Sequence, residues 1–231
     1  MFHPEGPSFG ELMRQALSST REGYDLLASK FDHTPFRTPD AILEAVEGAL
    51  AGSTGDGLDV CCGTGAGASM LRRVLPGRVV GVDWSEGMLG VARRDVPGVE
   101  FHQGDALELA YDQEFDLAVS FGAFGHFRVY EQPRLLAGIH RALRPGGRFV
   151  FVTSEQPGLF HRTALVYRVF NLVMKVRNRF LKPPFVMYYL NFLLPEAARR
   201  LEDAGFRVEV RPLAAEGPFT RARLVVATRV S

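Results

Sequence analysis

Short apolar runs alternate with helical patterns through the middle of the chain. Between residues 58 and 155 the apolar runs are LDVC, RVVGV, VEFHQ, FDLAVSF and RFVFVT, in that order. Apolar residues with helical spacing separate several of them, near 66–75, 86–95 and 131–143. This rhythm predicts a mostly parallel sheet with helices on both faces. Ligands bind such sheets at the carboxyl ends of the strands.

Other patterns flank this region. Residues 1–57 hold two helical patterns, at about Phe9–Phe31 and Pro39–Leu50, and we interpret them as an N-terminal helical arm. After the fifth strand, residues 156–194 interrupt the rhythm with a long apolar and basic stretch.

The chain then returns to the alternating pattern. A helix is predicted over Pro195–Gly205, followed by strands at Phe206–Val210 and Leu224–Thr228 whose close spacing favours an antiparallel pair. Residues 58–155 and 195–231 therefore predict one α/β domain with a seven-stranded sheet, mostly parallel, whose last strand is antiparallel.

The composition is that of an ordinary globular protein, with 46% hydrophobic and 23% charged residues, which excludes disordered and fibrous classes. The formal net charge of +1 argues against a surface built wholly for nucleic acid. This near-neutral total is the sum of two oppositely charged parts of the chain. Residues 156–195 contain six Lys or Arg and no Asp or Glu, so they carry +6 and the rest of the chain −5.

The cysteines and the N-terminus indicate a reducing compartment. Cys61 and Cys62 are adjacent, which disfavours a disulfide that staples the fold, and no His or Cys stands at metal-ligand spacing beside them, so no metal site is expected. The first residues lack a signal-peptide pattern, and no apolar run is long enough to span a bilayer. We expect a soluble, cytoplasmic protein.

The first strand runs into a glycine-rich turn that opens a helix. Gly63, Gly65 and Gly67 allow the backbone to approach a ligand closely, and the helix start offers free N–H groups. Asp83 ends the next strand, where a carboxylate can accept hydrogen bonds from ribose hydroxyls. These features alone leave NAD and S-adenosylmethionine both open.

Six motifs, in order and spacing, resemble the class I S-adenosylmethionine-dependent methyltransferases of the small-molecule type. They are Asp59 to Gly67, VDWSEGML with Asp83 and Met88, QGDA ending at Ala106, FDLAVSF ending at Phe121, LRPGGRF starting at Leu143, and AGF ending at Phe206. The resemblance covers roughly residues 24–154 and 195–229. It implies a Rossmann-like fold, S-adenosyl-L-methionine as cofactor with S-adenosyl-L-homocysteine as product, and in-line methyl transfer.

The resemblance implies a site for the methionine and ribose parts of the cofactor. Asp59 and the backbone of Gly63 and Gly65 would surround the methionine moiety, and Asp83 would bind both ribose hydroxyls. Arg37, in the loop before the second arm helix, would pair with the methionine carboxylate, or else is a surface arginine.

It also implies an adenine site. Trp84 and Met88 would pack on the adenine ring, Asp105 would accept its exocyclic amine, and the Ala106 N–H would lie near a ring nitrogen. Phe121 would lie near the sulfonium. The alternatives are that Asp83 or Asp105 caps a helix, and that Trp84 and Met88 fill the core.

Tyr24 and His126 are the candidate catalytic residues. Tyr24 lies in a segment similar to the helix that folds over the cofactor in small-molecule methyltransferases, which implies a position near the methionine end, or else it shares a buried helix face with Phe31. His126, in the FGAFGHF loop after the fourth strand, is the candidate general base if the acceptor must lose a proton. The alternative is that His126 only hydrogen-bonds the backbone.

Residues 156–194 stand where this superfamily often inserts a substrate-binding cap, so we expect a helical lid there. Arg168, Lys175, Arg179 and Lys182 fall along one helical stripe. The alternatives are a peripheral membrane contact that gives access to a lipid-like substrate, and a helix docked on the body or on a second copy. Either a monomer or a homodimer is compatible with the sequence.

The predicted activity is methyl transfer to a small, apolar or aromatic acceptor. Ten of the 18 Phe fall in segments expected to surround that acceptor. A non-catalytic nucleoside-binding module is the alternative, as is a lipid-directed methyltransferase at the membrane surface. A nucleic-acid substrate is not expected, because the Asn/Asp-Pro-Pro-aromatic motif that holds a flipped base is missing after the fourth strand.

Overall fold

The computed structural model describes residues 3–158, 162–213 and 221–230. Its elements are α1 (Phe9–Leu17), α2 (Thr20–Leu27), the 3-10 helix η1 (Ala28–His33), α3 (Asp40–Ala49), β1 (Gly57–Val60), α4 (Ala66–Val74), β2 (Val79–Asp83), α5 (Glu86–Asp95), β3 (Glu100–Gln103), η2 (Ala106–Glu108), β4 (Phe115–Val119), η3 (Phe124–His126), α6 (Gln132–Ala142), β5 (Leu143–Ser154), α7 (Arg162–Phe180), α8 (Glu196–Asp203), β6 (Phe206–Pro212) and β7 (Ala222–Arg229).

The sheet confirms the predicted fold class. Its seven strands run in the order β3-β2-β1-β4-β5-β7-β6, and β7 pairs antiparallel with both β5 and β6 while the pairs from β3 to β5 are parallel. The strand order reverses between β1 and β4, so a crevice opens at the carboxyl ends of these two strands.

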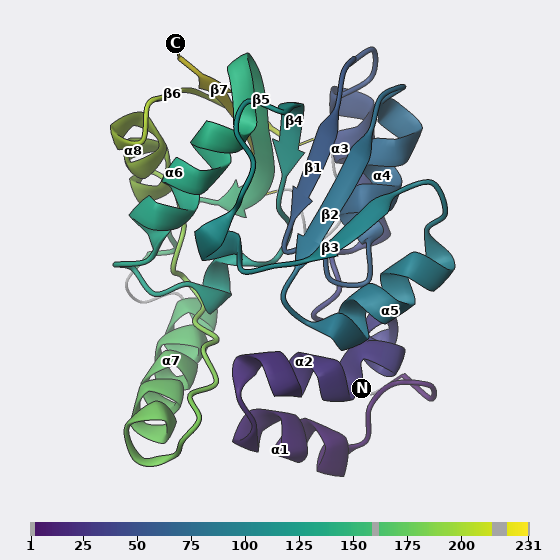
Figure 1. Cartoon of the computed structure of the whole chain (residues 1–231). Helices are drawn as coiled ribbons and strands as arrows, with labels where there is room; N and C mark the ends of the chain where they lie inside the picture. Colours follow the sequence, from purple (N-terminus) through teal and green to yellow (C-terminus); the bar gives the residue numbers. More distant parts are fainter. Residues whose placement is uncertain (1–2, 159–161, 214–220, 231) are drawn as a thin grey trace.

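Helices cover both faces of the sheet, because alternate strand residues point to opposite sides. Leu58 and Val60 of β1 pack with α6 and α8, whereas Leu117 and Val119 of β4 pack with α3, α4 and α5. Figure 1 shows these two helical layers on either side of the strands. The resulting double core holds the strand ends in fixed positions.

The first helical pattern of the arm is divided into two helices, which corrects the single pattern predicted over Phe9–Phe31. Ser19 begins α2 with a capping box: its hydroxyl accepts from the Glu22 N–H, and the Glu22 carboxylate accepts from the Ser19 N–H. Ser8 and Glu11 make the same arrangement at the start of α1. A capping box satisfies helix N–H groups that otherwise have no partner, so the chain turns at Ser18–Ser19 rather than continuing.

Within the 156–194 segment, α7 holds the chain that follows it through two asparagines seven residues apart. The Asn178 side chain donates to the Phe185 carbonyl at 3.0 Å and accepts from the Phe185 N–H at 2.9 Å. Asn171 makes the same two-way contact with the backbone of Tyr189. Over the described residues, neither α7 nor any other helix is long and apolar enough to cross a membrane.

Replacing Asn178 by Ala should loosen the segment after α7. The substitution leaves the N–H and carbonyl of the buried Phe185 without these partners, at a cost of roughly 1–3 kcal/mol. Hydrogen exchange of the Phe185 amide should accelerate. Lys175→Ala, at an exposed position of the same helix, is the matched control and should leave that exchange unchanged. Unaltered exchange in the Asn178 variant would contradict the anchoring role.

Candidate functional site

One cavity of about 390 Å³ lies at the carboxyl ends of the strands, within the size range of small-molecule sites. Its walls come from the segments that follow β1, β2, β3 and β4, from α2 and η1 of the arm, and from Pro184 and Val186 after α7. Eleven predicted site residues line it together: Tyr24, Arg37, Asp59, Gly63, Asp83, Trp84, Met88, Asp105, Ala106, Phe121 and His126.

Gly65 is the predicted site residue that is not in the lining. It precedes α4 with a left-handed φ of 89°, and a Cβ there would come within 3.1–3.2 Å of Val96, Ala92 and Phe101. The glycine therefore allows the turn to pack against α5 and β3. Its position is set by packing, not by contact with the cavity.

Asp59 places an unsatisfied carboxylate at the cavity wall. It is buried, and its Oδ2 has no hydrogen-bond partner among the described residues. Burial raises the pKa of Asp59 to about 8, an effect that the Ala68 N–H opposes and the nearby Asp83 reinforces. A buried carboxylate oxygen without a donor lacks a cationic or N–H partner, which a ligand can supply.

Asp83 is held by the backbone on both oxygens. Oδ2 accepts from the Gly63 N–H and Oδ1 from the Ser85 N–H, each at 2.9 Å. Burial nevertheless raises the pKa of this carboxyl. The alternative that Asp83 caps a helix does not hold, because α5 is capped by Ser85. The two backbone bonds fix the carboxylate in the cavity and leave further lone pairs for hydroxyl donors.

The residues predicted to bind adenine differ in their exposure and in their hydrogen bonds. Trp84 is 41% exposed, so its ring is free to stack on a ligand, whereas Met88 is 1% exposed and packs against Tyr24 and Phe31. Asp105 accepts from the Leu107 N–H at 2.9 Å and so caps η2, as the alternative interpretation expected. Met88 thus belongs to the core as well as to the cavity wall, and one oxygen of Asp105 is already engaged.

Tyr24 and His126 form a hydrogen-bonded pair on the other side of the cavity. The Tyr24 hydroxyl lies 2.8 Å from Nε2 of His126, and Nδ1 of His126 lies 2.7 Å from the Val186 carbonyl. A carbonyl only accepts, so Nδ1 carries the proton and Nε2 accepts from Tyr24. Burial lowers the pKa of His126 and raises that of Tyr24. Both groups are therefore neutral near pH 7.

Arg37, a predicted site residue, and several polar residues that were not predicted complete the walls. The Arg37 guanidinium lies 2.8 Å from Asp40 and 3.5 Å from Asp32, and the Thr64 hydroxyl donates to Asp32 at 2.7 Å. Thr64 stands inside the glycine turn, a signal that could have identified it. Arg128 and Glu131 also line the cavity, and no local motif marks them.

Two expectations about the acceptor side were too broad. Of the ten Phe expected around the acceptor, Phe31, Phe36, Phe121 and Phe127 line the cavity, while Phe124 stacks with Phe192 in the core and Phe180 is 79% exposed. Phe160 lies outside the described residues. Among the described residues of the 156–194 segment, only Pro184 and Val186 line the cavity, and none of the described residues of α7 does.

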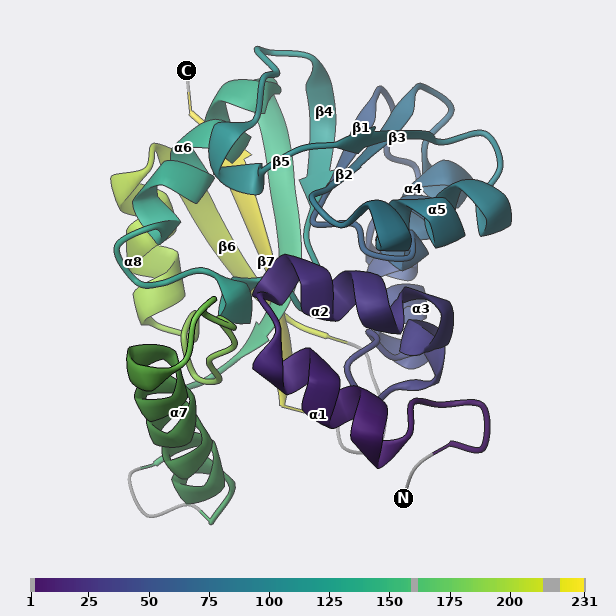
Figure 2. The ribbon, with the colours of Figure 1, turned by 60° about the horizontal axis from the view of Figure 1, so that its bottom comes forward.

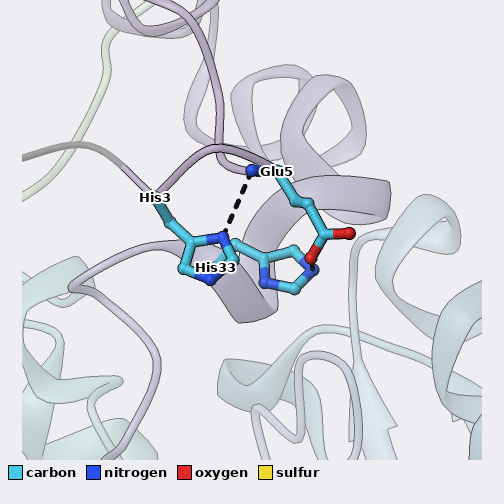
Figure 3. A group of neighbouring side chains, drawn as sticks. All are labelled: His3, Glu5 and His33. Atoms are coloured by element: carbon cyan, nitrogen blue, oxygen red, sulfur yellow. Dashed lines mark hydrogen bonds and ion pairs between the residues drawn. The ribbon is translucent and has the colours of Figure 1, made fainter.

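Among the described residues, His3, Glu5 and His33 form one exposed group whose ligand atoms lie within 4.8 Å of one another, outside the cavity (Figure 3). The two imidazole rings stack at 4.6 Å with 14° between their planes. None of the three lines the cavity. Cys61 and Cys62 do line it as free thiols, and burial raises the pKa of both.

The chain is similar in sequence to several curated enzymes. A family profile described as "Methyltransferase domain" matches residues 58–147. The demethylmenaquinone methyltransferase of Geobacillus kaustophilus is 34% identical over 174 residues, covering 67% of this chain and 72% of the relative. That of Oceanobacillus iheyensis is 30% identical over 138 residues, covering 57% of this chain. The match spans only 58% of the Oceanobacillus enzyme.

Solved structures show the same fold. A structure described as a DhpI–SAH complex superimposes with a TM-score of 0.68 at 21% identity, covering 96% of this chain and 99% of that one. A putative methyltransferase from Bacillus halodurans gives 0.61 at 18% identity, covering 84% and 100%.

Asp59→Asn should change how stability depends on pH. The folded-state pKa of about 8 lies above the usual 3.9, so the folded protein holds a proton that the unfolded chain releases, and stability falls as pH rises between these values. The variant cannot ionise and should be more stable than the wild type at pH 8, by about 5 kcal/mol, with the difference shrinking toward pH 4. Urea unfolding at several pH values measures this; parallel curves for the two proteins would contradict it.

Proposed function

The chain belongs to the class I S-adenosylmethionine-dependent methyltransferases, and from that premise we propose that it methylates a small apolar acceptor, a hydroxylated aromatic ring of the quinol type. The observation that carries the proposal is that one cavity joins two kinds of wall. Asp59, Asp83 and Trp84 form a polar nucleoside-type wall, and Tyr24 and His126 form an aromatic, proton-accepting one. A protein that only binds the nucleoside does not need a proton-accepting wall.

The residues of the first wall fit the cofactor. The Asp59 oxygen without a partner suits the ammonium group of a methionine moiety, the fixed Asp83 carboxylate suits a pair of ribose hydroxyls, and the exposed Trp84 ring suits adenine. When bound, S-adenosylmethionine supplies a methyl group already activated by its sulfonium. The protein then has to hold the acceptor in line and exclude water.

The second wall can take a proton from the acceptor. Nε2 of His126 accepts from the Tyr24 hydroxyl, so a quinol hydroxyl bound beside Tyr24 can donate to the Tyr24 oxygen as Tyr24 donates to His126. Nδ1 donates to Val186 throughout and keeps the ring in one tautomer. Loss of the hydroxyl proton raises the electron density of the ring, so a ring carbon can form the bond to the methyl carbon as the carbon–sulfur bond breaks and the sulfur keeps the electron pair. That ring carbon then loses its own hydrogen as a proton while the ring oxygen regains one, so one proton is released for each methyl group transferred.

The acceptor class follows from the aromatic lining and from the relatives. Phe31, Phe36, Phe121 and Phe127 give a flat, apolar environment, and the relatives from Geobacillus and Oceanobacillus are named for a quinone substrate. We assign the arm (1–57) and the cap insertion (156–194) the role of covers, because both contribute cavity walls next to the core of 58–155 and 195–231.

Asp83→Asn should weaken S-adenosylmethionine binding by about ten- to a hundredfold, since a hydrogen bond to a charged group contributes roughly 1.5–3 kcal/mol. Calorimetric titration measures the affinity. Asp112→Asn, at an exposed position outside the cavity lining, is the matched control and should bind as the wild type does. Equal affinity in the Asp83 variant would remove this carboxylate from the cofactor site.

His126→Asn and Tyr24→Phe should each lower the rate of methyl transfer by about a hundredfold or more, the usual contribution of a positioned acid or base. The probe acceptor is a reduced 1,4-naphthoquinone without a substituent at carbon 2, with release of S-adenosylhomocysteine as the readout. The affinity for S-adenosylmethionine should change little, because these residues belong to the acceptor wall.

The oxidised ring of the same probe serves as the control, because it has no hydroxyl proton to give. Turnover of the oxidised and reduced rings at equal rates would contradict a proton-accepting role for the pair. Full activity of both variants would do the same.

A further inference from the structure

Helix α7 exposes its apolar residues to solvent, which is the reverse of an ordinary surface helix. Seven large apolar side chains on it are exposed: Leu165, Val166, Val169, Leu172, Val173, Val176 and Phe180. At 100° per residue these positions fall within an arc of about 120°. The opposite side carries Asn171, Met174 and Asn178, which face the chain that follows the helix or are buried.

A basic border runs along one side of this apolar arc. Lys175 and Arg179 are exposed and fall next to Leu172 on the helical wheel, and Lys182 follows the end of the helix. No Asp or Glu occurs from residue 156 to residue 195. An apolar stripe bordered by cations is the pattern of helices that lie in the interface of an anionic bilayer.

Helix α1 carries a second exposed apolar stripe. Phe9, Met13 and Leu17 are exposed at spacings of four residues and so form a single stripe. The Arg177 side chain, which lies at the edge of the apolar arc beside Val166, donates to the carbonyls of Ala16 and Ser18 at 3.0 Å and so ties the end of α1 to α7. Figures 1 and 2 show both helices at the same end of the molecule.

This end of the molecule is also where the cavity is covered. Val186 follows α7, lines the cavity, donates its N–H to Thr20 of α2 and accepts from His126. A surface formed by α1 and α7 therefore adjoins the segments that separate the acceptor wall from the outside.

We propose that the exposed faces of α7 and α1 are a docking surface for an anionic lipid bilayer, from which an apolar acceptor reaches the cavity. The entry of the acceptor rests on the proposed function; the docking itself rests only on the exposed apolar and basic residues. The helices lie on the bilayer, with the apolar arc of α7 at the acyl boundary and Lys175, Arg179 and Lys182 at the headgroups.

The charge pattern favours a bilayer over a second copy of the chain. In an antiparallel pairing of two α7 helices across a two-fold axis, the basic borders would face one another, and the segment has no acidic side chain to separate them. Anionic headgroups neutralise the same border, each cation near the surface contributing about 1 kcal/mol.

Sedimentation with vesicles tests the proposal. The full chain should bind vesicles of equal parts phosphatidylcholine and phosphatidylglycerol at low salt, and bind phosphatidylcholine alone at least about tenfold more weakly. Leu172→Gln/Val176→Gln should reduce binding to the anionic vesicles by about tenfold or more, because the substitutions replace two apolar side chains of the arc with polar ones. Gln is a good helix former, so the helix itself should be retained. Val210→Gln/Val230→Gln, also exposed but away from α1 and α7, is the matched control and should bind normally.

Calorimetry with S-adenosylmethionine, in the absence of lipid, separates this proposal from the proposed function. The Leu172/Val176 variant should retain wild-type affinity and wild-type turnover of a soluble naphthoquinol. No binding of the wild type to anionic vesicles at low salt would overturn the docking surface while leaving the methyl transfer intact. Wild-type dimers that the variant converts to monomers, without any vesicle binding, would assign the face to a second copy and overturn it as well.

Discussion

The imidazole of His126 is the point at which three separate parts of the chain meet. The ring accepts a hydrogen bond from the Tyr24 hydroxyl of the arm and donates one to the Val186 carbonyl in the segment after α7. The backbone of His126 belongs to the loop after β4. Val186 is further tied to α2 through Thr20, and the Tyr188 N–H donates to the Gly125 carbonyl beside His126. Buried hydrogen bonds of this kind are costly to break singly, so the acceptor wall depends on all of them together.

The cofactor wall depends on a different constraint, the geometry of the turn after β1. Cys61 has a left-handed φ of 60°, a conformation that glycine adopts readily and that costs a residue with a Cβ roughly 1–2 kcal/mol. The chain therefore tolerates backbone strain next to the buried Asp59, whose pKa burial raises to about 8. Two locally unfavourable features side by side are typical of binding sites.

The Rossmann-like core was predictable because its signals are local. Each strand is a short apolar run that ends at a polar residue such as Asp83, and each helix between strands has its own periodicity, so order and direction follow from connection rules. The division of the arm was missed although Ser8/Glu11 and Ser19/Glu22 are sequence signatures of capping boxes. The Tyr24–His126 pair could not be derived, because 102 residues separate its members and only tertiary packing brings them together. The outward orientation of α7 was equally hidden, because apolar residues such as Met174 and Val173 occupy both sides of the helix.

The contacts that form the acceptor wall also tie the two covers to each other. Tyr24 of α2, His126 of the loop after β4 and Val186 of the chain after α7 line the cavity and are joined by hydrogen bonds. The Val186 segment is not a strand of the sheet, and hydrogen bonds to the side chains of Thr20, Asn178 and His126 anchor it. Such contacts open locally at less free energy than a sheet does. This segment is therefore the part of the acceptor wall most able to move while the cofactor wall stays fixed, and it follows α7, which carries the exposed apolar face.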